Sequence, residues 1–167
     1  MNQLFPTLPS AIIVDGGGGC LRLLLASTHL QRRSDLEHER HNIEQLMRRY
    51  VTAWRERNWD DWGQLFEKES DFISWRGWWG RTRDENVALH RATPTAIGTQ
   101  MVNYSLTTEK VAFLCESIAL VHAKWVWREF SEDASPPSDR RGLLTMVLVK
   151  GNSDWSIRSL HNSRIIE

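Results

Sequence analysis

The chain has 167 residues, of which 41% are hydrophobic and 25% are charged, a composition typical of folded domains that argues against disordered and fibrous classes. The length suits a single hydrophobic core, and 21 basic residues balance 21 acidic ones, so we expect neither nucleic acid nor membrane as a partner. The two cysteines, Cys20 and Cys115, form neither a CxxC pair nor a zinc-ligand spacing. We therefore expect no disulfide framework and a cytoplasmic location.

The first segment of the chain differs from the rest. Pro6, Pro9 and the glycine run 16–19 oppose regular structure, so residues 1–33 are predicted to be a flexible extension ahead of one domain over 34–167. An ordered arm at a dimer contact is the alternative. A degenerate export signal is a further reading, and it would place the protein outside the cytoplasm.

Two helices are predicted to follow the extension. Ser34 and Glu37 form a capping-box pattern, and apolar residues then recur at helical spacing, which predicts a helix over 35–57. Asp60 or Asp61 is expected to cap a second, shorter helix. Three apolar side chains share one face of that helix: Trp62, Leu65 and Phe66.

A short strand and a third helix come next. Residues 71–75 are aromatic and β-branched, which predicts a strand, and Gly77 and Gly80 bracket a turn. Thr82 and Glu85 form another capping-box pattern, which predicts the start of the third helix.

The second half of the chain has the period of two that is typical of strands. Five segments carry this pattern: 100–108, 110–115, 117–129, 141–150 and 155–163. Helices followed by antiparallel strands indicate an α+β class, with about three helices packed on a curved, mostly antiparallel sheet of five to six strands that forms a cone. Segment 117–129 is apolar at its start on both faces, so we expect this strand to be covered on two sides, one of them by the helices.

Two histidines are candidates for acid/base chemistry. Alternation in the last strand places His161 on the same face as Trp155 and Ile157, which predicts that it lies inside the fold. An imidazole there could act as general acid or base, alone or paired with His90 of the third helix. A buried histidine bonded to a backbone carbonyl explains the same pattern, and His90 could equally pack its helix against the glycine-flanked turn. We expect no metal site, because the two histidines have no clear third ligand.

Asp71 and three tryptophans complete the candidate site. Asp71 could be an accessory acid at the pocket rim, because burial near Trp75 would raise its pKa, although an aspartate at such a position is more often a turn cap. Trp75, Trp78 and Trp79 could form flat walls for an aromatic ligand. They could instead plug the cone.

The order of the elements resembles the nuclear transport factor 2-like superfamily, and within it the SnoaL-like and SgcJ/EcaC group, over roughly residues 36–165. The resemblance is carried by Tyr50-Val51-Thr52-Ala53-Trp54, Asp71-Phe72-Ile73, Gly77 to Arg81, His90, Ile118 to His122, Leu144 to Val149, Trp155-Ser156-Ile157 and His161-Asn162. It implies a cone with an internal pocket, with His90 over its mouth. It also implies a homodimer through the sheet face, with Trp125 and Trp127 in the interface. Members of this superfamily include isomerases, dehydratases, polyketide cyclases and association domains, so the fold alone selects no reaction.

We therefore predict a domain that binds a small apolar or aromatic molecule, with cofactor-free acid/base chemistry of the isomerase, dehydratase or cyclase type. His161, His90 and Asp71 are the predicted catalytic residues. The predicted ligand contacts are Trp75, Trp78, Trp79, His122, Tyr50 and Asn162. The alternative is a non-catalytic ligand carrier or homo-association domain whose pocket is plugged.

Overall fold

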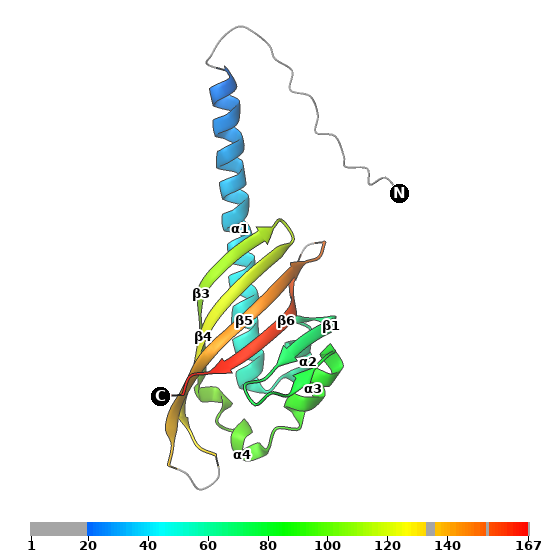
Figure 1. Cartoon of the computed structure of the whole chain (residues 1–167), viewed down its shortest axis with the longest axis vertical. Coiled ribbons are helices and arrows are strands. Elements are labelled where there is room, and N and C mark those ends of the chain that lie inside the picture. Colours follow the sequence, from blue (N-terminus) through cyan, green and yellow to red (C-terminus); the bar gives the residue numbers. More distant parts are fainter. Residues whose placement is uncertain (1–19, 133–135, 153, 167) are drawn as a thin grey trace. The chain divides into compact units, whose positions relative to one another are not determined.

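The computed structural model describes three stretches of the chain: residues 20–132, 136–152 and 154–166. The chain divides into two compact units, one ending at Glu37 and the other running from His38 onward. The first helix, α1 (Cys20–Glu56), contains residues of both units (Figure 1). None of the helices in the described part of the chain is long and apolar enough to cross a membrane.

Helix α1 begins at Cys20, well before the predicted start at residue 35. Ser34 therefore lies inside the helix, and the capping role predicted for it is wrong. No glycine or proline interrupts the sequence between these two residues, so the leucines, arginines and glutamine there allow the helix to extend back. Residues 1–19 lie outside the described residues, and the flexibility of the extension 1–33 stays a prediction.

The part of α1 after His38 packs on the concave face of the sheet (Figure 1). Its buried side chains follow the predicted helical spacing: Ile43, Leu46, Met47, Tyr50 and Ala53. This spacing places them on one stripe of the helix, which is the stripe that closes the core.

Helix α2 (Trp59–Gly63) is shorter than predicted, and its cap is Asn58 rather than either aspartate. The Asn58 side chain accepts a hydrogen bond from the backbone N–H of Asp61 at 3.2 Å. Gly63 ends the helix against α3, where an added Cβ would lie 2.6 Å from Cγ2 of Val87. The glycine thus allows α2 and α3 to approach each other closely.

Strand β1 (Phe66–Ile73) begins earlier than predicted and includes Phe66, which the helical spacing places on the second helix. It pairs antiparallel with the short strand β2 (Trp79–Gly80). The predicted turn between them is confirmed, and Gly77 has a φ of +83°, a value that glycine adopts without steric cost.

Helix α3 (Arg83–Arg91) begins as the sequence predicts. Thr82 caps it by accepting a hydrogen bond from the Glu85 backbone N–H at 3.2 Å, and the Glu85 carboxylate accepts in return from the backbone N–H of Arg81 at 2.8 Å. Two short elements, α4 (Thr95–Gly98) and the 3-10 helix η1 (Met101–Asn103), lead into the main sheet.

The main sheet contains four long strands: β3 (Tyr104–Cys115), β4 (Ile118–Phe130), β5 (Ser138–Lys150) and β6 (Trp155–Arg164). The two predicted strands 100–108 and 110–115 form one strand, β3, with a register shift near Glu109. The strand order is β2-β1-β6-β5-β4-β3, antiparallel except between β1 and β6. The predicted α+β class, with helices packed on a six-stranded sheet, is confirmed.

The core fills the concave side of the sheet. Four residues of β4 are buried there in alternation: Ala119, Val121, Ala123 and Trp125. The Trp125 ring lies over Gly142 of β5, where an added Cβ would be 2.5 Å from it. Trp127 packs against the same core. The prediction that Trp125 and Trp127 form an outer dimer interface is therefore wrong, because this alternation directs both rings inward.

Candidate functional site

An open cavity of about 240 Å³ lies between the concave face of the sheet, α1 and α3. Its lining is mainly aromatic: Tyr50, Trp54, Phe72, Trp75, Trp78, Tyr104, Trp125, Trp127 and Phe130. Many of these rings contact one another, as do Tyr50 and Trp54, whose stacked centroids lie 6.3 Å apart. Cavities of this kind, apolar with a few polar groups, are typical of small-molecule sites.

His90 is a buried titratable group in this lining. It is 3% exposed, and its ring centroid lies 4.5 Å from that of Trp62 and 4.7 Å from that of Phe72. Burial among these rings lowers the pKa of His90 to about 4, against a smaller opposing effect of its hydrogen bond to Asn86. The imidazole is therefore neutral at pH 7.

The hydrogen bond of His90 also fixes which ring nitrogen carries the proton. Nδ1 lies 2.7 Å from the backbone oxygen of Asn86, and a carbonyl oxygen can only accept. Nδ1 therefore carries the proton, and Nε2 is left as a hydrogen-bond acceptor.

Asn86 fixes the helix that carries His90. It is fully buried, and its Nδ2 lies 3.4 Å from both the backbone oxygen and the hydroxyl of Ser70 on β1. Gly80 gives it room, because a Cβ at that position would lie 1.9 Å from Asn86 Oδ1. The glycine that bracketed the predicted turn thus determines how closely β2 approaches α3.

Three further polar groups face the aromatic lining. Burial raises the pKa values of both Tyr50 and Tyr104, so both phenols keep their protons. Asn162 of β6 accepts a hydrogen bond from Trp125 Nε1 at 2.8 Å. This bond orients the amide and the Trp125 ring toward each other on the inner face.

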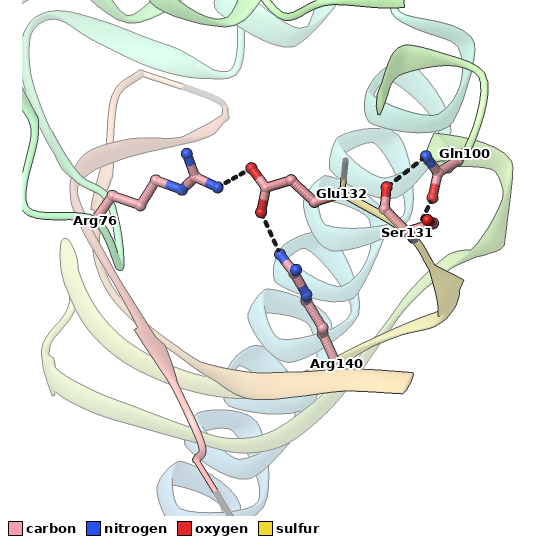
Figure 2. A network of polar contacts seen from close by, with 5 residues as sticks. All are labelled: Arg76, Gln100, Ser131, Glu132 and Arg140. Atoms are coloured by element: carbon pink, nitrogen blue, oxygen red, sulfur yellow. Dashed lines mark hydrogen bonds and ion pairs between the residues drawn. The ribbon is translucent and has the colours of Figure 1, made fainter. Parts of the chain in front are cut away.

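Charged side chains gather at the mouth of the cavity (Figure 2). The Glu132 carboxylate accepts from Arg76 through Oε1 and from Arg140 Nη1 through Oε2, the latter at 3.1 Å. These contacts lower the pKa of Glu132, and the hydrogen bond from Arg76 has the largest effect. The carboxylate therefore stays ionised. Gln100 fixes the adjacent backbone, since it donates to the Ser131 oxygen at 2.9 Å and accepts from the Ser131 N–H at 2.7 Å.

The structure brings five of the predicted site residues to this cavity: Tyr50, Trp75, Trp78, His90 and Asn162. The other four do not line it: Asp71, Trp79, His122 and His161. The predicted convergence of His90 with His161 is therefore not observed.

A β-bulge explains the position of His161. Val147 pairs with Ser159 but Leu148 pairs with Ile157, so β6 has one extra residue, Arg158, between these pairs. An extra residue reverses the faces of every residue that follows it. His161 is consequently exposed, and the prediction that it shares the buried face of Ile157 is wrong.

Asp71 and Trp79 lie together away from the cavity. Asp71 accepts from Trp79 Nε1 at 2.9 Å and pairs with Arg158 at 3.1 Å. Trp79 is 52% exposed and does not line the cavity. Of the three tryptophans predicted to form the pocket wall, Trp75 and Trp78 do so. His122 lies on the opposite face of β4 from the core, with Nδ1 3.2 Å from Thr145 Oγ1.

Sequence reasoning missed the charged mouth. Arg140 continues the period of two of β5, two residues before Gly142 and four before the buried Leu144, and this alternation could have identified it as an inward-facing arginine. Arg76 and Glu132 lie 56 residues apart on separate loops, and no local pattern links them. The described residues also contain no group of three His, Cys, Asp or Glu side chains that could hold a metal ion.

Comparisons with known proteins agree with this architecture. A family model described as a SnoaL-like domain matches residues 43–167. No curated protein matches the chain.

Three solved structures illustrate the likeness. A candidate scytalone dehydratase from Novosphingobium aromaticivorans is 16% identical with a TM-score of 0.68, over 80% of this chain and 89% of its own. A ketosteroid isomerase-like protein from Erwinia carotovora is 13% identical with a TM-score of 0.66, over 76% and 96%. A domain of unknown function with a cystatin-like fold from Nostoc punctiforme is 24% identical with a TM-score of 0.61, over 77% and 78%. At these identities the likeness shows the fold alone.

Proposed function

The chain belongs to the SnoaL-like domain family, and from this premise we propose that its aromatic cavity binds one small, largely apolar molecule that carries a hydrogen-bond donor. The observation that carries the proposal is the cavity itself, with the buried neutral His90 in its wall. A family of this kind hosts both enzymes and binding domains, so the activity has to be argued from the site.

The size of the cavity limits the ligand. An apolar cavity of about 150 Å³ is known to hold a benzene ring. At about 240 Å³, the cavity has room for one substituted ring or a small fused pair of rings. An ordered water needs only on the order of 10–15 Å³, so the space is much larger than a plugged cone would retain. This supports the ligand-binding form of the prediction over the plugged form.

The polar groups of the cavity limit the ligand further. Nδ1 of His90 is occupied by Asn86, so Nε2 is the nitrogen that can accept from a ligand O–H or N–H. In a cavity lined mainly by aromatic rings, one such hydrogen bond orients the ligand.

A reaction of the isomerase, dehydratase or cyclase type would use His90 Nε2 as the proton acceptor. A pKa of about 4 makes this imidazole a weak base at pH 7, so its first role in our proposal is binding. The scheme does not use His161 or Asp71, because neither lines the cavity.

The test is a binding measurement with 1-naphthalenemethanol, a neutral fused-ring alcohol, followed by tryptophan fluorescence and calorimetry. We expect saturable 1:1 binding to the wild-type protein. Thr93→Trp places a bulky ring at the half-buried lining residue Thr93 and should abolish binding. Thr95→Trp is the matched control, because Thr95 is exposed and does not line the cavity, and it should leave binding unchanged. Equal binding by both variants, or no binding by the wild type, would overturn the proposal.

His90→Asn tests the hydrogen bond separately. Asparagine can keep a donor near the position of Nδ1 but removes the acceptor Nε2. We expect this variant to bind 1-naphthalenemethanol about tenfold more weakly and to bind 1-methylnaphthalene, which has no donor, as the wild type does. Equal losses for both compounds would assign His90 to packing only.

We also propose that two copies of the domain associate through the outer face of the sheet. Apolar side chains on this face are partly exposed, Ile118 at 36% and Leu143 at 40%. Sedimentation velocity should show a dimer, and Leu143→Glu should convert it to a monomer. A monomeric wild-type protein at high concentration would refute the association.

Two narrower expectations accompany this proposal. We propose that the chain belongs to the SgcJ/EcaC group, because its motifs resemble those of that group. We propose a cytoplasmic location, because Cys20 and Cys115 lie far apart in the sequence and indicate no disulfide framework. Intact-mass analysis of the protein from its natural host tests the cytoplasmic location, because export with cleavage would remove residues from the amino terminus.

A further inference from the structure

The mouth of the cavity differs sharply in character from its interior. The interior is aromatic, whereas Arg76, Arg140 and Arg164 all lie around the ring of Trp75, with guanidinium carbons 4.8, 6.0 and 5.1 Å from its centroid. A ligand that fills the cavity therefore ends against guanidinium groups.

Charge at this mouth is unbalanced among the described residues. Glu132 is the carboxylate that pairs with Arg76 and Arg140, and Arg164 has no carboxylate partner in the described part of the chain. Two guanidinium groups thus share one carboxylate, with a third on the Trp75 ring, and among these described residues the excess positive charge favours an anionic group on the ligand.

Arg140 is held in place independently of its ion pair. Its guanidinium carbon lies 3.9 Å from the centroid of the Phe130 ring, and its side chain is only 15% exposed. Its Nε is buried without a hydrogen-bond partner, while Nη1 donates to Glu132. A guanidinium stacked in this way keeps its orientation when its acid partner leaves, and it has an unused donor.

Glu132 shows what kind of group this mouth accepts. One carboxylate bridges the two guanidinium groups, with Oε1 on Arg76 and Oε2 on Arg140 (Figure 2). The spacing of the two arginines is therefore that of a single carboxylate, which in the free protein is supplied by the chain itself.

From these observations we infer that the ligand is an aromatic carboxylate with an O–H or N–H on its ring. The ring fills the cavity with this donor on His90 Nε2, and the carboxylate replaces that of Glu132 on Arg140 and Arg76. The inference rests on the proposed function, because it names the ligand class of the same cavity. Glu132 then acts as an internal competitor, and its release is part of binding. Removing a competitor strengthens binding of the ligand that it competes with and of no other.

The experiment compares two probes with the same ring system on the full-length protein: 1-naphthoate carries the carboxylate without the donor, and 1-naphthalenemethanol carries the donor without the charge. We expect 1-naphthoate to bind the wild type more tightly, with an affinity that falls as salt concentration rises, while the affinity for the alcohol does not change with salt. Glu132→Gln should raise the affinity for 1-naphthoate about 5- to 10-fold. Arg140→Gln should lower it about tenfold or more, and both variants should leave the affinity for the alcohol unchanged.

Matched variants keep the test decisive. Arg76→Gln, at a half-exposed residue, should repeat the effect of Arg140→Gln if the latter protein folds poorly. Arg128→Gln is the control, because Arg128 pairs with Asp139 and does not line the cavity. Binding of the alcohol that Thr93→Trp blocks would support the cavity proposal. If 1-naphthoate then binds no more tightly than the alcohol and responds to none of the mouth variants, the carboxylate inference fails while the cavity proposal stands. If neither compound binds, the proposed function fails first.

Discussion

Replacing His90 by phenylalanine should change how the stability of the domain depends on pH. In the folded protein, burial lowers the pKa of His90 to about 4, whereas an unfolded chain restores it to its ordinary value of 6.5. Between these two values the unfolded state binds a proton that the folded state excludes. The free energy of unfolding therefore has no contribution from this group above pH 6.5, and it falls as the pH drops from 6.5 toward 4.

The size of this effect follows from the two pKa values. The difference between 6.5 and about 4 corresponds to ~3 kcal/mol at 1.36 kcal/mol for each pKa unit. A phenyl ring at residue 90 fits among the rings of Trp62 and Phe72 and cannot titrate. His90→Phe should thus be slightly less stable than the wild type at pH 7.5, since it loses the bond to Asn86, and should gain relative stability on acidification.

Urea unfolding followed by tryptophan fluorescence, at several values between pH 7.5 and pH 4, measures this difference. The carboxylates with lowered pKa values, Glu39 and Glu132, are present in both proteins, so the comparison cancels their contributions. His122→Phe, on the outer face of β4, controls for the loss of a histidine and should follow the wild-type curve. A stability difference between wild type and His90→Phe that is the same at every pH would refute the buried, neutral imidazole.

Two further substitutions test the packing behind the site. Gly80→Ala should destabilise the domain by about 1–3 kcal/mol in urea unfolding, because its Cβ would overlap Asn86 Oδ1, whereas Gly151→Ala meets nothing closer than 3.7 Å and should cost much less. Glu39→Ala should cost about 1–3 kcal/mol, because it removes the acceptor of the buried Trp155 Nε1, 2.7 Å away; a cost near zero in the same assay would show that water replaces the carboxylate.

The fold was largely predictable because its signals are local. Alternation in β4 and β5 and the Thr82 cap each depend on neighbouring residues, and each appears in the structure. The failures share a different cause. The bulge at Arg158 has no mark in the sequence, since nothing distinguishes an extra residue from an ordinary polar one, yet it reverses the face of His161.

The candidate site was predictable in its walls and not in its mouth. Aromatic residues such as Trp75 and Trp78 were identifiable because nine tryptophans in one small domain require a core, a pocket or an interface. The mouth requires Arg76, Glu132 and Arg140 to meet from three separate segments. Such a meeting depends on the tertiary fold, and residue type alone does not indicate it.

The position of β6 between β5 and β1 has a consequence for how the protein is made. Strand β1 pairs with only the two residues of β2 on one side, and its long partner is the last strand of the chain. During synthesis, β1 and the helices packed on it therefore lack their main support until β6 has left the ribosome. A chain that lacks β6 would hold the β3–β5 meander and leave the α3 side of the cavity unassembled, so the ligand site forms only after β6 has paired with β1.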